Sequence, residues 1–308
     1  MEQNQSFMSR TDCEICGSET CNTLFSCQFT EDPTSSFLRA FYSDRVDLQR
    51  LAGGLFEVAK CQQCGFIWQK YVLGQRLMLK LYEEWIAPDE AHDRALDQPI
   101  SKSFQLAQEA ALIGLFFGTP PREIEVLDFG MGWGSWCLMA KAFGYQAWGT
   151  ELSQKRILYA KEQGIDVMSW EDIGDHKFHF INAEQVFEHI SQPLETLRYL
   201  VNSLNPGGLI HLSVPDGRNI ERKLARGDWM APKGSAWSLN PVSPLEHINC
   251  FTHASLTQMA NRVGLQRARI PLLEIAASQK WSSPAAIARN ALRPFYRCFF
   301  GTNLLFRK

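Results

Sequence analysis

The chain has 308 residues, of which 45% are hydrophobic and 21% charged, a composition typical of a folded protein with a sizeable buried core. Its formal net charge of -2 provides no general field that would attract nucleic acid or an anionic membrane. The opening MEQNQSFMSRTDC lacks the basic and then apolar pattern of a secretory signal, and the longest apolar run, 110–117, is too short to cross a bilayer. We therefore expect a cytoplasmic protein.

Six of the nine cysteines lie between positions 13 and 64. Four of them form two equally spaced pairs, each followed by glycine: Cys13-x-x-Cys16-Gly17 and Cys61-x-x-Cys64-Gly65. Two residues between paired cysteines let both sulfur atoms bind one tetrahedral metal ion, and four thiolates complete the coordination of a structural zinc. We therefore expect a small zinc-binding module in residues 1–75. The alternative, four buried free thiols, makes the matched spacing a coincidence.

Helical patterns in residues 76–122 indicate a connector that ends at Gly118 and Pro120-Pro121. Strands and helices then alternate, with strands expected at 125–129, 147–152, 178–183, 208–214 and 266–272 and helices at 135–143, 154–163, 194–204 and 254–263. This alternation predicts an α/β domain over residues 123–272, built on a doubly wound, mainly parallel sheet with helices on both faces. Residues 216–246 interrupt the pattern, and we expect an insertion over the carboxyl ends of the strands.

Residues 273–308 form a basic and aromatic tail. From Lys280 to Lys308 there are six Lys or Arg residues and no Asp or Glu. One interpretation is a weak contact with a membrane surface. The others are a strand or helix docked on the α/β domain, or a dimer contact.

The most informative segment is VLDFGMGWGSW, in which an apolar strand leads into three glycines and then a helix. Gly130, Gly132 and Gly134 would let the backbone turn tightly and let a ligand approach it, beside the free N–H groups of the helix terminus. Glu151, after the second strand, could accept both hydroxyls of a ribose. The GxGxG spacing and Asp128 before the turn favour a cationic sulfonium ligand over a dinucleotide. The alternative is that the glycines serve only helix–strand packing.

Residues 123–272 resemble the class I, S-adenosylmethionine-dependent methyltransferases in DFGMGWG, in Glu151, in FHFINAEQVFEHI and in LNPGGLIHLSVP. The resemblance implies a Rossmann-like fold that binds S-adenosylmethionine at the carboxyl ends of its strands. It places the methionine part of the cofactor on Asp128 and the three glycines, and the ribose on Glu151. It also implies three further residues near the adenine or the transferred methyl group: Glu171, Glu184 and Gln185. Many relatives have an acid where Gln185 stands.

The order of a zinc motif and then a methyltransferase domain is similar to that of the sugar C-methyltransferases and their relatives in saccharide gene clusters. This similarity implies a small-molecule acceptor such as a nucleotide sugar or a saccharide. In those enzymes an EH pair in the place of Glu246 and His247 supplies a histidine base, preceded two residues earlier by a tyrosine. Here that position is Pro244. His247 is the candidate base; the alternative is a capping or core histidine.

Two other functions stay open. Some ribosomal RNA methyltransferases loosely share the layout, but positions 1–75 contain six Lys or Arg and nine Asp or Glu, which disfavours a nucleic-acid partner. The second is a catalytically silent fold that binds a protein through its zinc module.

The pair Glu188-His189, just after the fourth expected strand, also has two interpretations. It could provide a base near the cofactor, or it could fasten the fourth strand to the helix that follows.

Overall fold

The computed structural model describes residues 6–86, 97–268 and 301–308. The chain divides into two compact units, and each unit collects separate stretches. Unit 1 comprises Met1–Ala91, Phe187–Leu194 and Val214–Met259, and unit 2 comprises His92–Val186, Glu195–Ser213 and Ala260–Lys308. The predicted insertion, 216–246, therefore belongs to the same unit as the cysteine-rich module. The predicted division at residues 75, 122 and 272 remains a proposal.

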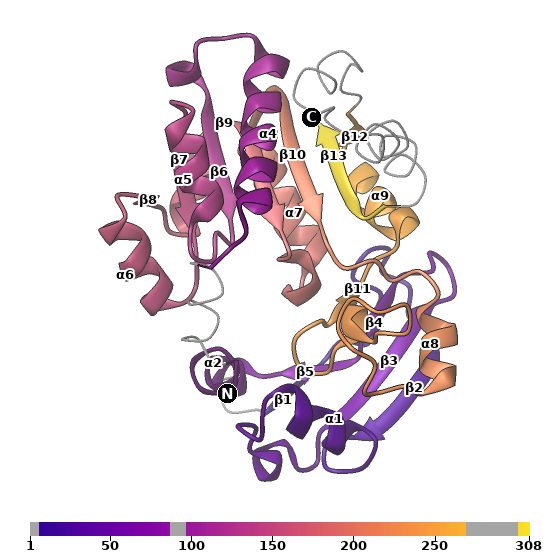
Figure 1. Cartoon of the computed structure of the whole chain (residues 1–308). Coiled ribbons are helices and arrows are strands. Elements are labelled where there is room, and N and C mark those ends of the chain that lie inside the picture. Colours follow the sequence, from indigo (N-terminus) through magenta and orange to yellow (C-terminus); the bar gives the residue numbers. More distant parts are fainter. Residues whose placement is uncertain (1–5, 87–96, 269–300) are drawn as a thin grey trace, which may run out of the picture. The chain divides into compact units, whose positions relative to one another are not determined.

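Unit 2 is built on a seven-stranded sheet in the order β12-β13-β10-β9-β6-β7-β8 (Figure 1). The strands are β6 (Glu125–Phe129), β7 (Gln146–Thr150), β8 (Asp166–Val167), β9 (Phe178–Glu184), β10 (Leu204–Ser213), β12 (Gln266–Arg267) and β13 (Asn303–Arg307). Strands β6 to β10 pair in parallel, whereas β13 runs antiparallel to both β10 and β12. The predicted doubly wound, mainly parallel sheet is confirmed.

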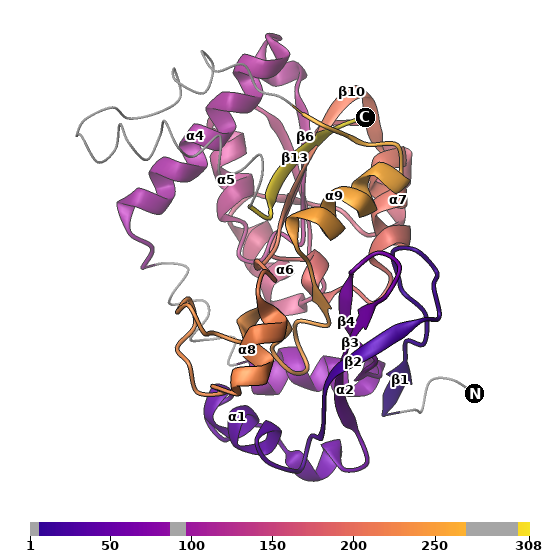
Figure 2. The same ribbon diagram turned by 90° about the vertical axis from the view of Figure 1, so that its right-hand side faces the viewer.

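Helices cover both faces of this sheet. Figure 2 shows α4 and α5 on one face and α7 on the other. The helices are α4 (Ile100–Phe117), α5 (Ser135–Ala142), α6 (Gln154–Glu162) and α7 (Pro193–Asn202), with short 3-10 turns η4 (Pro121–Glu123) and η5 (Glu171–Asp175). Leu106 and Ile113 of α4 and Trp136 of α5 pack with β6, β7 and β9 in one apolar core. Helix α4 ends at Gly118, which is left-handed (φ +63°) as a glycine C-cap allows.

Strand β13 comes from the end of the predicted tail. Leu304 and Phe306 are fully buried, and Leu209 to Ser213 of β10 pair with Arg307 to Asn303. For these residues the structure shows a strand docked in the sheet, one of the three alternatives. Residues 269–300, and with them most of the tail, lie outside the described part of the chain.

Unit 1 contains a four-stranded sheet in the order β11-β4-β3-β2, with every pair antiparallel. Its strands are β2 (Cys21–Gln28), β3 (Leu55–Cys61), β4 (Ile67–Gln69) and β11 (Asn249–Cys250), and β1 (Phe7–Ser9) pairs separately with β5 (Tyr71–Leu73). The helices are α1 (Thr34–Phe41), α2 (Gln75–Lys80) and α8 (Ile220–Arg226), with short turns η2 (Leu48–Leu51), η3 (Leu81–Trp85), η6 (Phe187–His189) and η7 (Asn240–Val242). Helix α9 (His253–Arg262) contains the residue, Met259, at which unit 1 ends. Trp229 of the insertion packs against Phe25, Phe37 and Phe56, so the insertion is part of this core.

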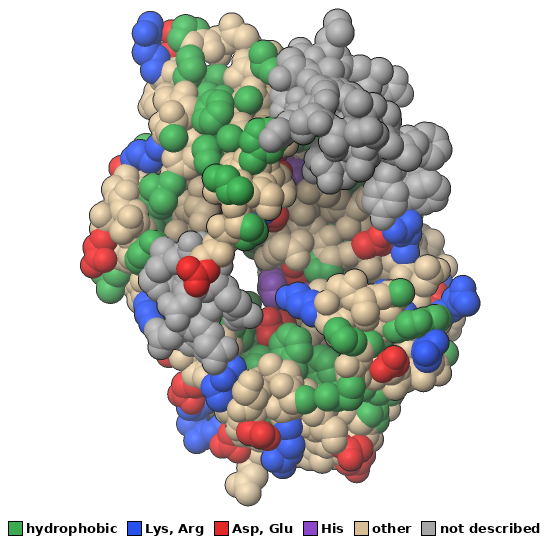
Figure 3. Space-filling model, viewed as in Figure 1, with side chains coloured by type: hydrophobic (Ala, Val, Ile, Leu, Met, Phe, Trp, Pro, Cys, Tyr) green, Lys and Arg blue, Asp and Glu red, His purple; other side chains and the backbone are tan. Residues whose placement is uncertain are grey.

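Hydrophobic side chains gather on the surface over α4 (Figure 3), where Ile100, Phe104 and Leu115 are exposed. Among the helices that the structure describes, none is long and apolar enough to cross a membrane.

Candidate functional site

The three glycines of the loop after β6 all have left-handed backbones, with φ of +74° at Gly130, +57° at Gly132 and +77° at Gly134. A Cβ atom at Gly130 would lie 2.6 Å from Val186, and one at Gly134 would lie 2.2 Å from Ile165. A Cβ atom at Gly132 would meet nothing within 4 Å. A larger residue at Gly130 or Gly134 would have to displace a neighbouring side chain, whereas Gly132 faces open space that a ligand can occupy.

That loop borders a cavity of about 170 Å³ within unit 2, called here the glycine-loop pocket. Its lining comes from α4 and the segment just before it, from the ends of β6 and β9, from the glycine loop, and from the start of α5: Gln98, Lys102, Leu106, Asp128, Gly130, Met131, Trp133, Ser135, Trp136, Asn182 and Glu184. Three predicted cofactor residues, Asp128, Gly130 and Glu184, line it. Gly132, Gly134, Glu151, Glu171 and Gln185 are absent from this lining.

Asp128 is a buried carboxylic acid at the wall of the glycine-loop pocket. Burial raises its pKa from 3.8 to about 7; a hydrogen bond from Asn182 opposes the rise, and the nearby charge of Glu184 adds to it. Asn182 Nδ2 donates to Asp128 at 2.8 Å, and the other amide atom, Oδ1, lies 2.7 Å from His211 Nδ1. Because an amide oxygen accepts, His211 donates there. A row of buried polar side chains thus holds Asp128 across three neighbouring strands.

Glu151 follows the end of β7, close to the glycine loop. Its carboxylate accepts hydrogen bonds from the backbone N–H of Gly132 at 3.1 Å, of Leu152 at 2.8 Å and of Ser153 at 3.0 Å. Arg156 lies 3.4 Å from the same carboxylate. Glu151 therefore ties the loop to the start of α6 in this structure, and a ribose there would compete for its oxygens.

The other residues predicted at the strand ends differ in setting. Glu184 forms an ion pair with Lys102 of α4 at 3.3 Å, and both residues line the glycine-loop pocket. Gln185 has an unusual left-handed backbone (φ +57°), and its N–H donates to the Ser213 carbonyl at 2.7 Å. Left-handed geometry at a non-glycine residue is costly and often marks functional sites. Glu171 begins η5 and is exposed.

Sequence comparison assigns the chain to a family. A family model described as "Methyltransferase domain" matches residues 103–268, more than half of the chain. The chain belongs to the methyltransferase domain family. It is a methyltransferase with a Rossmann-like fold.

Several solved structures are similar to this methyltransferase. One is the plantazolicin methyltransferase in complex with S-adenosylhomocysteine, at 16% identity and a TM-score of 0.45, covering 75% of this chain and 92% of that one. Another is an S-adenosylmethionine-dependent methyltransferase from Archaeoglobus fulgidus, at 13% identity and a TM-score of 0.40, covering 68% and 98%. No curated protein matches the sequence.

The four predicted zinc ligands of the methyltransferase come together in unit 1. The sulfur atoms of Cys13, Cys16, Cys61 and Cys64 lie within 4.8 Å of one another, with Cys13–Cys64 at 3.4 Å and Cys16–Cys61 at 3.5 Å. Zinc–sulfur bonds of about 2.3 Å at tetrahedral angles separate sulfur atoms by about 3.8 Å, so the donor set fits zinc. Gly17 and Gly65 are left-handed, with φ of +71° and +73°. Each glycine N–H donates to the carbonyl of the first cysteine in its pair.

The second predicted cluster contains the candidate base. His247 is buried, and its Nδ1 hydrogen-bonds to the Asn240 carbonyl. Burial and, to a smaller extent, the nearby His189 lower the pKa of His247 to about 3, so the ring is neutral near pH 7. Tyr42 donates to the Glu246 carboxylate at 2.6 Å, and burial raises the pKa of Glu246.

The pair Glu188-His189, which sequence analysis left open, lies in η6 beside His247. The His189 and His247 ring centroids are 4.9 Å apart, and His189 Nε2 lies 3.8 Å from the Glu188 carboxylate. Leu245, just before Glu246, has a left-handed backbone (φ +73°) that a leucine rarely adopts. The fold thus brings the two histidines together from distant segments of the chain.

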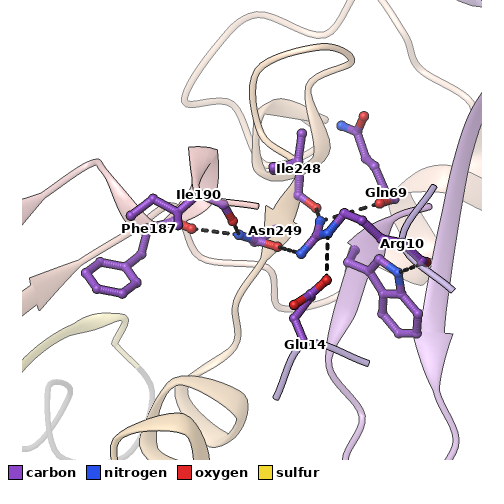
Figure 4. A network of polar contacts seen from close by, with 8 residues as sticks. Arg10, Glu14, Gln69, Phe187, Ile190, Ile248 and Asn249 are labelled. Carbon is purple, nitrogen blue, oxygen red and sulfur yellow. Dashed lines mark hydrogen bonds and ion pairs between the residues drawn. The ribbon is translucent and has the colours of Figure 1, made fainter. Parts of the chain in front are cut away.

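A buried polar network holds this cluster to the cysteine-rich part of unit 1 (Figure 4). Arg10, which shortly precedes Cys13, donates to the Asn249 side chain at 2.7 Å and to the Ile248 carbonyl at 3.1 Å. Asn249 in turn donates to two carbonyls of the segment that contains Glu188 and His189: Phe187 at 2.8 Å and Ile190 at 2.6 Å. Arg10 and Asn249 therefore join η6, β11 and the first cysteine pair.

Sequence reasoning missed several residues of the glycine-loop pocket, among them Lys102, Trp133 and Asn182. Asn182 was detectable as a polar residue inside the expected strand 178–183, and in the structure it pairs in register with Asp128. Lys102 had no such pattern, since its place depends on how α4 lies against β9.

Proposed function

We propose that this methyltransferase transfers the methyl group of S-adenosylmethionine to a small-molecule acceptor, a nucleotide sugar or another saccharide. The observation that carries the cofactor site is the buried Asp128 beside a left-handed glycine loop with open space over Gly132. A ligand with a cationic amine and sulfonium offsets the cost of ionising Asp128. An uncharged end of a dinucleotide would not offset the cost of ionising Asp128.

In this proposal different residues of the glycine-loop pocket bind the two charged groups of the methionine moiety. Asp128 and Glu184 face its amino group, and Lys102 offers a cation for its carboxylate. Gly130, Gly132 and Gly134 let the loop backbone approach the ligand. Glu151 binds the ribose after giving up its bond to Gly132, Glu171 approaches the adenine, and Gln185 lies beside the transferred methyl group.

The four cysteines hold a structural zinc in the proposal, because four thiolates leave no coordination position for a substrate. The acceptor class is supported by the acidic balance of the cysteine-rich module, which has six Lys or Arg and nine Asp or Glu. A module that binds RNA phosphates needs more Lys and Arg than Asp and Glu.

His247 is the proposed base for the acceptor, with Glu246 beside it. Methyl transfer is an in-line displacement that depends on positioning, and a base contributes when the acceptor must lose a proton. A histidine pKa near 3 makes His247 a weak base in the ligand-free protein. The low pKa favours a role in which the His247 ring is neutral.

The test of the cofactor site is calorimetry with S-adenosylhomocysteine. We expect binding in the micromolar range, about -8 kcal/mol, which Gly132→Val should weaken by at least about a hundredfold by filling the open space. Gly164→Val is the matched control, since Gly164 is also left-handed (φ +75°) with nothing within 4 Å, but it follows α6 and lies outside the glycine loop between β6 and α5. Equal affinity in the two folded variants would place the cofactor elsewhere.

A further inference from the structure

Glu188, His189 and His247 form a cluster that neither the glycine-loop pocket nor the cysteine site explains. One carboxylate oxygen and two imidazole nitrogens lie within 4.8 Å of one another, all in unit 1. Glu188 is 0% exposed and His247 is 7% exposed, while His189 is partly exposed. We propose that these three side chains bind a second divalent metal ion of the zinc class.

The hydrogen bonds of the two rings orient them as metal ligands. His189 Nδ1 lies 2.8 Å from the Glu246 carbonyl, and His247 Nδ1 contacts the Asn240 carbonyl. A carbonyl oxygen only accepts, so each Nδ1 carries its proton and, in the neutral ring, Nε2 keeps the lone pair. A backbone carbonyl on the second nitrogen is the arrangement by which proteins fix the tautomer and direction of a metal-binding histidine.

The third donor supplies the charge that a cation requires. The Glu188 carboxylate lies 3.8 Å from His189 Nε2, so two potential ligand atoms lie close together, one of them on a fully buried side chain. Bonds of about 2.1 Å at tetrahedral angles hold donor atoms about 3.4 Å apart, a spacing that small side-chain movements reach from this arrangement.

The neighbouring contacts hold the cluster in place. Asn249 anchors the carbonyls on both sides of Glu188-His189, at Phe187 and Ile190. The carbonyl partner of His189 belongs to Glu246, whose carboxylate is held by Tyr42. The donors are therefore oriented by buried groups before any ion binds, which reduces the ordering cost of binding.

Two histidines and one carboxylate leave a coordination position open, unlike the four cysteines. Water or an oxygen of a small molecule can take that position. A metal on His247 Nε2 uses the lone pair with which that atom would accept a proton. While the ion is bound, it therefore replaces the free base proposed at His247; without the ion, Nε2 is free to accept a proton.

The test is metal stoichiometry of the full chain after incubation with excess zinc and removal of free ion. We expect about two ions per chain, falling to about one in His189→Asn and in Glu188→Gln. His253→Asn, a histidine of unit 1 outside the cluster, should keep both. Cys61→Ser with Cys64→Ser should lose the other ion and keep the one at the cluster.

Cobalt substitution separates the two sites and checks folding. The cysteine site should show intense sulfur-to-cobalt charge-transfer bands, which His189→Asn and Glu188→Gln retain if unit 1 is folded. The second ion should add only weak ligand-field bands. One zinc per wild-type chain, unchanged in His189→Asn and removed by the cysteine substitutions, would overturn the proposal whatever the methyl acceptor proves to be.

Discussion

At the scale of single residues, Asp128 shows how burial creates a binding preference. Its carboxyl is removed from water, held by Asn182 and placed near Glu184, so the folded protein favours the protonated form up to about neutral pH. A cationic ligand end reverses that preference because it favours the ionised form. Cofactor binding and proton release at Asp128 should therefore be linked.

The linkage gives a pH-dependent prediction. The pKa of Asp128 is 3.8 in the unfolded reference and about 7 in the folded protein, so the stability it contributes is full below about pH 4 and is lost as pH rises through 7. Relative to Asp128→Asn, which does not titrate, the wild-type protein without cofactor should lose unfolding free energy over that window. Urea unfolding at a series of pH values measures the difference.

The same substitution should alter the heat of binding. At pH 6, calorimetry in buffers of different ionisation enthalpy should show proton release when S-adenosylmethionine binds the wild-type protein, and none for Asp128→Asn. A heat that is independent of the buffer in the wild-type protein would mean that Asp128 does not ionise on binding.

The site residues that could be predicted are those that stand together in one short motif. Asp128 and the three glycines stand in one segment, so chain order alone brings them together. Lys102 and Trp133 reach the pocket through helix packing, and the neighbours of His247 come from distant segments. The physical reason is that contact across long sequence separations depends on tertiary packing, which local patterns do not encode.

At the scale of elements, the cysteine pairs could be predicted from the sequence, whereas strand β13 could not. The two cysteine pairs were identified from spacing, because a metal ion requires that geometry locally. Strand β13 was left among three alternatives, since Asn303 to Arg307 stand far from β10 in sequence and follow a basic, aromatic stretch. Strand β8 of unit 2 was not predicted, and the predicted strand 266–272 is described only as far as residue 268. The other strands and helices expected between residues 125 and 263 agree with the structure to within about four residues.

Removing one cysteine pair should release the structural metal. We expect Cys61→Ser with Cys64→Ser to lose about one zinc per chain and to lower the thermal midpoint of unit 1, since structural zinc binding is coupled to folding. Elemental analysis and a thermal melt measure both effects. Cys21→Ser with Cys27→Ser, two cysteines of β2 outside the cluster, is the control. An unchanged zinc content in the first variant would exclude the four-cysteine site.

Strand β13 should contribute substantially to the stability of unit 2. Phe306 is completely buried, and its ring centroid lies 5.3 Å from the Arg267 guanidinium, so Phe306→Ala should cost about 3–5 kcal/mol of unfolding free energy. Arg307→Ala, an exposed neighbour, should cost about 0.5 kcal/mol or less. Denaturant unfolding compares them. A cost for Phe306→Ala as small as that of the control would mean that the strand is not paired in solution.

At the scale of the whole molecule, each unit is assembled from separate segments. The alternation of strands and helices was sufficient to predict the sheet of unit 2, because each repeat builds on its neighbour. Residues 216–246 lack that alternation and suggested an insertion over the sheet, whereas α8 and Trp229 build them into unit 1. Their hydrophobic partners, Phe25 and Phe37, stand near the start of the chain, so no local pattern could pair them.

Methyl transfer to a small molecule is the central activity proposed for this protein. The direct measurement incubates the full chain with S-adenosylmethionine labelled in its methyl group and with separate small-molecule and RNA fractions of a cell extract, followed by mass spectrometry. We predict a labelled saccharide or nucleotide sugar together with S-adenosylhomocysteine, and no such product with Gly132→Val. Label confined to RNA, or no label in any fraction despite bound cofactor, would contradict the central claim.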